Sequence, residues 1–367
     1  MPDPRISKLA KVLVHYSVEV QKGQQVLIRT SPIADELTLA VYEEIIKAGA
    51  HPFLTNEVPG TKEAFYKFAS DEQLDYVSPI DKLIIETFDA YIHLWADYNT
   101  RDLSGTDPNR VARSRKAHAA INQKFLNRVA KGKMRWSLTV YPNYAMAQEA
   151  DMSLRDYAEF VYGAGMLNEE DPVVFWRAEA AKQQQLIKWM KGHDKAVLKG
   201  SNVDIRLSVK DRPFIECAGK ENFPDGEIFT GPVEDSVNGW IRFKYPAIFS
   251  GQEIPDIELW FENGMVVKEK ASKNQELLTS ALNTDAGSRF LGEWGIGTNY
   301  GIQRFTKNML FDEKIGGTIH FAVGAGYPES GSKNESGLHW NMLCDMSHAE
   351  ITVDGDLFYK DGNTVIQ

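Results

Sequence analysis

The segment of residues 22–54, KGQQVLIRTSPIADELTLAVYEEIIKAGAHPFL, predicts a strand, a helix and a second strand in direct succession. Its apolar run at residues 26–28 ends at a serine-proline turn, and the apolar residues of 35–47 then recur with helical periodicity. Gly49 follows as a helix C-cap, and residues 51–54 begin the next extended segment. The segment is therefore a strand-helix-strand unit.

The same alternation continues through the N-terminal half of the chain. Extended segments at residues 90–94 and 136–140 flank a helical segment at residues 112–128. Strands separated by helices of this length imply a parallel sheet that helices cover on both faces. We therefore expect an α/β domain with a parallel sheet in the N-terminal half.

The second half of the chain has a different texture. A long helical stretch over residues 153–191, broken near residue 171, is expected to connect two domains. Beyond it, short segments of alternating polarity such as residues 203–209 are separated by glycine turns, which is typical of antiparallel strands. We expect an N-terminal α/β domain with a helical connector over residues 1–195, and a strand-rich α+β domain that binds metal over residues 196–367.

Composition excludes several classes of function. The formal net charge of -10 repels phosphate backbones, so we expect no nucleic-acid partner. The two cysteines are too few for a disulfide framework or a thiolate zinc site, and they suit a reducing cytosol. The N-terminus lacks the apolar core of a signal peptide, and no run of about 18 apolar residues predicts a membrane span. We expect a cytoplasmic protein with no membrane partner.

Four short segments of the second half carry the candidate chemistry. Glu227 and Glu293 each lie among glycines, which would hold a carboxylate in a cleft. In the third segment Ile319, Phe321 and Val323 share one strand face, which leaves His320 on the other. In the fourth, His339 and Asn341 lie two apart on a strand and project to one side. Carboxylates and imidazoles without thiolates form the ligand set of hydrolytic zinc, cobalt or manganese sites. Taken singly, however, a histidine in a strand is more often structural.

Together these segments resemble a known family. The matching phrases are, in order, PDGEIFTGP at 224–232, FLGEWGIGTN at 290–299, GTIHFAVGAGYPE at 317–329 and SGLHWNMLCDM at 336–346. They resemble the M29 metallopeptidases, the thermophilic-type aminopeptidases also called aminopeptidase T and aminopeptidase S. The opening strand and helix resemble the family as well, so the resemblance covers nearly the whole chain.

The resemblance implies a metal-dependent aminopeptidase that releases N-terminal residues from short peptides by metal-activated water, and that works as a homodimer. It implies two divalent ions, which would be zinc, cobalt, manganese or magnesium. Glu293 would bridge the ions and handle the proton of the attacking water. Tyr327 would be a ligand or a donor to the developing oxyanion. The residues that match the family's metal-binding positions are Glu227, Glu293, His320, Tyr327 and His339.

One position departs from the family pattern. The family usually has His-x-Asp in the fourth phrase, whereas this chain has His339-Trp340-Asn341. A neutral amide binds a divalent cation more weakly than a carboxylate does. The second ion is therefore expected to be loose, absent, or partly supported by Asp345, with Asn341 as its weakened ligand.

Two alternatives remain open on the sequence. The first is a catalytically weak relative that binds metal and peptide in the same cleft, for which Asn341 is the support. The second is a nucleotide or small-molecule binder in the N-terminal domain, with the C-terminal domain as a dimerisation platform. Residues 295–301, in the C-terminal half, are rich in glycine, but their spacing differs from that of dinucleotide-binding loops, so we expect no nucleotide site at that stretch.

Overall fold

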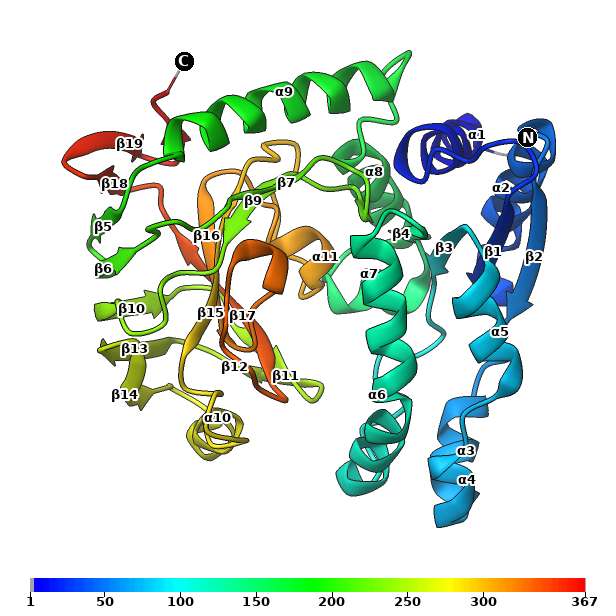
Figure 1. The fold of residues 1–367 in the computed structure, drawn as a ribbon, viewed down its shortest axis with the longest axis horizontal. Helices are drawn as coiled ribbons and strands as arrows, with labels where there is room; N and C mark the ends of the chain where they lie inside the picture. Colours follow the sequence, from blue (N-terminus) through cyan, green and yellow to red (C-terminus); the bar gives the residue numbers. More distant parts are fainter. Residues whose placement is uncertain (1–2, 367) are drawn as a thin grey trace. The chain divides into compact units, whose positions relative to one another are not determined.

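The computed structural model describes residues 3–366, which form two compact units (Figure 1). The first unit comprises the residues through Val173 together with Gly219–Pro224, and the second comprises Val174–Ala218 and the residues from Asp225 onward. The sequence placed the boundary at residue 195, after the long helix. The structure groups nearly all of that helix, α9 (Pro172–Met190), with the second unit, because its buried Leu186 and Met190 join the core of that unit.

The first unit is built on a five-stranded sheet in the order β2-β1-β3-β4-β8, and every neighbouring pair is parallel. The sheet confirms the expected α/β fold of this half. Its last strand comes from the short Gly219–Pro224 excursion of the chain. The strands are β1 (Gln25–Thr30), β2 (His51–Asn56), β3 (Ala90–Trp95), β4 (Arg135–Val140) and β8 (Asn222–Phe223).

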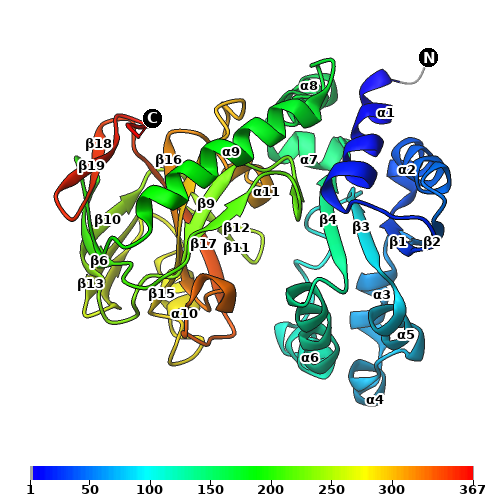
Figure 2. The same ribbon diagram turned by 45° about the horizontal axis from the view of Figure 1, so that its top comes forward.

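Helices cover both faces of this sheet, as the alternating pattern predicts. In Figure 2, α1 (Pro4–Lys11) and α2 (Asp35–Lys47) lie on one side of the strands, and α5 (Pro79–Thr87) and α6 (Pro108–Ala130) lie on the other. The remaining helical elements of this unit are η1 (Val12–Ser17), η2 (Pro32–Ala34), α3 (Thr61–Phe68), α4 (Asp71–Asp75), α7 (Tyr144–Glu149) and α8 (Leu154–Ala164). The sequence did not predict α3, α4 or α5.

The second unit is strand-rich, as expected, and contains two large antiparallel sheets. The larger sheet has eight strands in the order β14-β13-β10-β6-β5-β18-β19-β20. These strands are β5 (Lys195–Gly200), β6 (Val203–Ser208), β10 (Asn238–Phe243), β13 (Ile257–Glu262), β14 (Met265–Lys270), β18 (Ala349–Val353), β19 (Asp356–Lys360) and β20 (Asn363–Thr364). A separate hairpin joins β11 (Ala247–Phe249) to β12 (Gln252–Ile254), and α10 (Gln275–Leu282) follows β14.

The smaller sheet has five strands in the order β17-β16-β15-β9-β7. They are β7 (Ile215–Cys217), β9 (Glu227–Thr230), β15 (Leu291–Gly297), β16 (Thr318–Gly324) and β17 (His339–Asp345). The short helix α11 (Met309–Asp312) lies in the connection between β15 and β16, and η3 (Pro328–Ser330) follows β16.

The two sheets share one core. Phe321 of the smaller sheet contacts Phe243 and Phe261 of the larger one, with ring centroids 6.5 and 6.4 Å apart. Strands present alternate residues to opposite faces, so one set of side chains enters this core. That set is Ile228, Trp294, Ile296, Ile319, Phe321, Val323, Trp340, Met342 and Cys344. The other face of the smaller sheet therefore carries the intervening residues, which include the predicted site residues of β9, β15, β16 and β17.

Within residues 3–366, none of the helices combines the length and the apolar composition that crossing a bilayer needs.

Candidate metal centre

Small residues make room for polar side chains on the outer face of the smaller sheet. Gly295 of β15 lies directly opposite His320 of β16 in the strand register. A Cβ atom at Gly295 would come within 2.0 Å of Cε1 and 2.1 Å of Nε2 of the His320 ring. Only glycine leaves space for the imidazole to lie across the neighbouring strand, so the glycines around Glu293 shape the site rather than a turn.

The buried floor of the site unites three of the predicted residues from three adjacent strands. Nε2 of His320 lies 3.0 Å from Oε1 of Glu293 and 3.2 Å from Oε2 of Glu227. All three side chains are almost completely buried. Buried ionisable groups are costly unless they pair or bind a cation, so this arrangement needs positive charge at its centre.

The pKa shifts of Glu227 and His320 also indicate that this buried group of side chains favours a positive charge. Burial raises the pKa of Glu227 above its ordinary value, and the nearby Lys314 ammonium offsets that effect only in part. Burial would lower the pKa of His320, but the carboxylates of Glu227 and Glu293 outweigh burial and raise it to about 9. The two carboxylates thus favour the positively charged form of the imidazole that lies between them.

A lysine and two further carboxylates adjoin this floor, and the sequence did not single them out. Nζ of Lys314 lies 2.8 Å from Oε1 of Glu227 and 3.8 Å from Oδ1 of Asp225, and it also donates a hydrogen bond to Glu313. The Lys314 side chain is fully buried. Burial would lower the pKa of Lys314, but the carboxylates of Glu227 and Glu313 outweigh burial and raise it well above its ordinary value.

Asn341 contacts the ion pair of Glu313 and Lys314 and makes no hydrogen bond to His320. Its side-chain Nδ2 donates a hydrogen bond of 2.9 Å to Oε2 of Glu313. Asp345, the expected helper of a weakened ion, is engaged elsewhere, because it accepts a 2.9 Å hydrogen bond from Nζ of Lys244. Asn341 therefore extends the network of Glu313 and Lys314.

Tyr327 and His339 lie beside each other at a more exposed position. Their rings meet edge to face with centroids 5.2 Å apart, and 43% of the Tyr327 surface is exposed. Nδ1 of His339 lies 2.7 Å from the carbonyl oxygen of Ala325, an arrangement in which Nδ1 donates and Nε2 keeps a lone pair. An exposed histidine held in this tautomer suits a ligand at the solvent side of a metal site.

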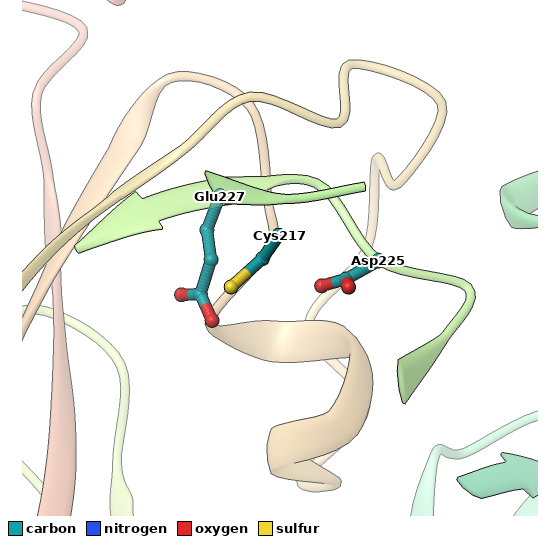
Figure 3. Close-up of side chains that lie close together, drawn as sticks. All are labelled: Cys217, Asp225 and Glu227. Carbon is teal, nitrogen blue, oxygen red and sulfur yellow. The ribbon is translucent and has the colours of Figure 1, made fainter. Parts of the chain in front are cut away.

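Figure 3 shows a second group of potential ligands beside the floor. The ligand atoms of Cys217, Asp225 and Glu227 all lie within 4.8 Å of one another. Two of these three residues, Asp225 and Glu227, also lie beside the Lys314 ammonium. The sequence interpretation had set Cys217 aside because two cysteines do not make a thiolate zinc site.

The donor set fits a divalent metal ion. Imidazole nitrogen and carboxylate oxygen are the ligands that zinc, cobalt and manganese take in hydrolytic sites. Oε2 of Glu227 and Oε2 of Glu293 are buried, and neither has a hydrogen-bond partner among residues 3–366. Glu227, Glu293 and His320 would hold the ion, with His339 and Tyr327 toward solvent. A metal between the carboxylates would take the place of the proton on His320.

Comparison with known proteins places the chain in a family. Residues 2–365 match the sequence profile described as thermophilic metalloprotease, M29. The chain belongs to the M29 family. This membership confirms the resemblance found in the four phrases, and it makes the protein a metallopeptidase that uses divalent metal.

Curated relatives named aminopeptidases align over nearly the full length of the chain. Aminopeptidase AmpS of Bacillus subtilis is 24% identical, with 98% of each chain covered. Aminopeptidase T of Thermus thermophilus is 26% identical, with 97% of this chain and 95% of that protein covered. Aminopeptidase 2 of Geobacillus stearothermophilus is 24% identical, with 98% of this chain and 95% of that protein covered.

Solved structures confirm the fold. Wild-type AmpT from Thermus thermophilus matches with a TM-score of 0.84 at 20% identity, covering 99% of both chains. The 2,5-dihydroxypyridine dioxygenase of Pseudomonas putida KT2440 matches with a TM-score of 0.63 at 16% identity, covering 99% of this chain and 97% of that one. Two different chemistries on one fold mean that the fold alone does not decide the reaction of an M29 chain.

The residues that the sequence interpretation missed had weak local signals. Asp225 lies inside the quoted phrase PDGEIFTGP, two residues before Glu227. Glu313 and Lys314 follow buried Phe311 and Asp312, just before a glycine pair. The adjacent apolar residues are a weak signal that the segment around Glu313 and Lys314 is buried.

Proposed function

We propose that this M29 chain is a metal-dependent aminopeptidase that removes N-terminal residues from short peptides. The observation that carries the proposal is the buried contact of His320 with Glu293 and Glu227 on one sheet face. The M29 relatives that align over almost the whole chain are named aminopeptidases, which favours full activity over the weak metal-binding alternative.

The metal would be held by Glu227, Glu293 and His320. When bound, a divalent ion supplies a Lewis acid that polarises the peptide carbonyl and lowers the pKa of a nearby water. Zinc, cobalt, manganese and magnesium all accept such a ligand set, although histidine favours the first three.

Glu293 would serve as the general base. One of its oxygens contacts His320, while Oε2 has no hydrogen-bond partner among residues 3–366 and is available to accept a proton from water. Holding one oxygen fixed leaves the other in a defined position, which is what proton transfer requires.

Tyr327 would donate its hydroxyl hydrogen to the oxyanion that develops on the scissile carbonyl. Its exposed position beside His339 supports this role, because a peptide could reach it from solvent. The neighbouring Phe229 ring, 5.7 Å from the Tyr327 ring, helps to fix its orientation.

An aminopeptidase must also recognise a free α-amine and exclude long chains. Excess carboxylate beside the metal would attract the ammonium group of a peptide N-terminus. Exclusion of long chains would come from a homodimer that encloses the site. Separately, the two free cysteines fit a cytoplasmic location.

The test is turnover of aminoacyl-p-nitroanilides and dipeptides by metal-free protein, with zinc, cobalt, manganese or magnesium added back. We expect metal-restored cleavage, and we expect Glu293→Gln to lower kcat by about 10²- to 10⁴-fold. Glu262→Gln, at an exposed strand end of the same unit, is the matched control and should keep full activity. Tight metal binding without cleavage of any substrate would overturn the proposal in favour of the weak relative.

A further inference from the structure

Lys314 occupies an unusual place for a lysine. Its side chain has no solvent exposure, and its Nζ lies within hydrogen-bond distance of Glu227 and Glu313. Asp225 is 3.8 Å away on a third side. A buried ammonium among several carboxylates takes the position that a metal ion commonly fills, because both satisfy clustered negative charge.

The backbone holds this lysine rigidly in place. The Lys314 carbonyl accepts a 3.0 Å hydrogen bond from the N–H of Asn299, and the N–H of Gly316 donates to the Asn299 carbonyl at 3.0 Å. The Asn299 side chain also donates a 2.8 Å hydrogen bond to the Asp225 carbonyl. A single residue thus ties the lysine segment to the loop that carries Asp225.

Close packing adds to this anchorage. A Cβ atom at Gly297 would come within 2.1 Å of the Ile315 carbonyl oxygen, so the segment after Lys314 lies directly on β15. The backbone that carries Lys314 is therefore held in place by tertiary contacts, so the position of the ammonium group is fixed.

We propose that the Lys314 ammonium fills one cation position of the centre, so that each chain binds a single divalent ion between Glu227, Glu293 and His320. The proposal rests on the metallopeptidase assignment and replaces the expected pair of ions. Oε2 of Glu227 lies 3.2 Å from Nε2 of His320, on the side of the single ion, so a second divalent ion would use Oε1 and would lie about 2.0–2.2 Å from that oxygen. Because Nζ of Lys314 lies only 2.8 Å from the same oxygen, the two cations would compete for one place.

Charge balance supports a single ion. The centre contains four carboxylates, those of Asp225, Glu227, Glu293 and Glu313. The positive charge of Lys314 reduces their net charge from −4 to −3. One divalent ion reduces the excess to a single negative charge, whereas two would turn this buried centre positive beside a fixed ammonium. An aspartate at position 341 and no lysine would give five negative charges, which two divalent ions would likewise reduce to one.

The amide at Asn341 also fits a centre in which the Lys314 ammonium replaces one metal ion. Its Nδ2 donates to Oε2 of Glu313, and the Lys314 ammonium donates to Oε1 of the same carboxylate. Both oxygens of Glu313 therefore already accept hydrogen bonds from side chains of this chain. An amide in place of a carboxylate and an added ammonium together change the charge by two, which equals the charge of one divalent ion.

The experiment counts ions in the purified full-length protein. Metal-free protein is loaded with manganese or zinc, dialysed, and measured by elemental analysis against protein concentration. We expect one ion per chain at saturation. The manganese form should show the six-line paramagnetic resonance spectrum of an isolated ion, because two ions about 3.5–4 Å apart would couple.

Variants test whether Lys314 limits the centre to one ion per chain. Lys314→Met combined with Asn341→Asp should raise the count from one ion to two per chain and produce a coupled manganese spectrum. Lys270→Met, which removes a lysine paired with Glu258 on the larger sheet, is the control and should keep one ion. Circular dichroism and thermal melting check that each variant is folded.

The outcomes separate this inference from the proposed function. Two coupled ions in the wild-type protein would overturn the inference whether or not peptides are cleaved. A folded double variant that still binds only one ion would also overturn it. One isolated ion in a wild-type protein that cleaves no peptide would support the inference while refuting the aminopeptidase assignment.

Discussion

The imidazole of His320 lies across the α-carbon of Gly295 on the neighbouring strand, so closely that an added Cβ would come within 2.0 Å of the ring. This contact sets the direction in which the histidine points. It brings Nε2 between Glu293 and Glu227, whose oxygens lie 3.0 and 3.2 Å away. The geometry of the proposed centre therefore depends on a residue that has no side chain.

Gly295→Ala should displace the His320 ring and weaken metal binding by about 10- to 100-fold, the usual effect of disturbing a residue that orients a ligand. Overpacking should also cost about 1–3 kcal/mol of folding free energy. Isothermal titration with zinc and thermal melting measure the two effects. Gly163→Ala, at a helical position with open space around it, is the control. Unchanged zinc affinity in Gly295→Ala would show that the ring position is not critical.

Tyr327→Phe should lower kcat roughly 10²- to 10³-fold, the typical effect of losing one donor to an oxyanion. The hydroxyl would act on the reacting carbonyl, so KM and metal content should change little. Steady-state kinetics and elemental analysis separate these effects. Tyr144→Phe removes an exposed hydroxyl of the first unit and should leave kcat unaltered. A loss of metal equal to the loss of activity would instead make Tyr327 a ligand.

Asp285 holds the chain just before β17. Its Oδ2 accepts a 2.6 Å hydrogen bond from the Gly337 N–H, and its Oδ1 accepts a 2.7 Å hydrogen bond from the Ser336 hydroxyl. Burial would raise the pKa of Asp285, but these hydrogen bonds, with others from Ser288 and Gly287, outweigh burial and lower it to about 2. The carboxylate thus fixes the approach of the strand that carries His339.

Asp285→Asn should lower the free energy of unfolding by about 1 kcal/mol at neutral pH, because hydrogen bonds to a charged acceptor are lost. The folded pKa lies below the unfolded value of about 3.9. The stabilisation is therefore complete above about pH 4–5 and disappears as the pH falls toward 2. Melting of both proteins at pH 7 and pH 3 checks this. Asp356→Asn, at an exposed strand residue, is the control, and a gap that is equal at both pH values would contradict the assignment.

The sequence predicted those parts of the fold whose signal is local. The helix at residues 35–47 was predicted with the bounds that the structure shows, because its apolar residues follow helical periodicity. Helix α3 was missed because its eight residues are too few for helical periodicity to identify it, and none of them is buried in the core. The sequence grouped α9 with the first unit, since a helix preceding a change of texture does not reveal which core it joins.

The same limit applies to the site. His320 could be chosen from the sequence because Ile319, Phe321 and Val323 share the opposite strand face. Glu227 and Glu293 could be chosen because each lies among glycines in a phrase that resembles the family. Lys314 could not, because its burial depends on how the segment between β15 and β16 folds back onto Gly297. The lysine belongs to the centre through tertiary contacts with Asp225 and Glu227, which no spacing along the chain encodes.

The most direct test of the account is to locate the metal in a crystal of the zinc-loaded protein by anomalous diffraction at the zinc edge. The account predicts one peak per chain, within about 2.0–2.2 Å of Nε2 of His320 and of carboxylate oxygens of Glu227 and Glu293. The Lys314 ammonium should remain beside Glu227 in the same crystal. A peak among Cys217, Asp225 and Glu227 with Lys314 displaced, or no peak near His320, would contradict it.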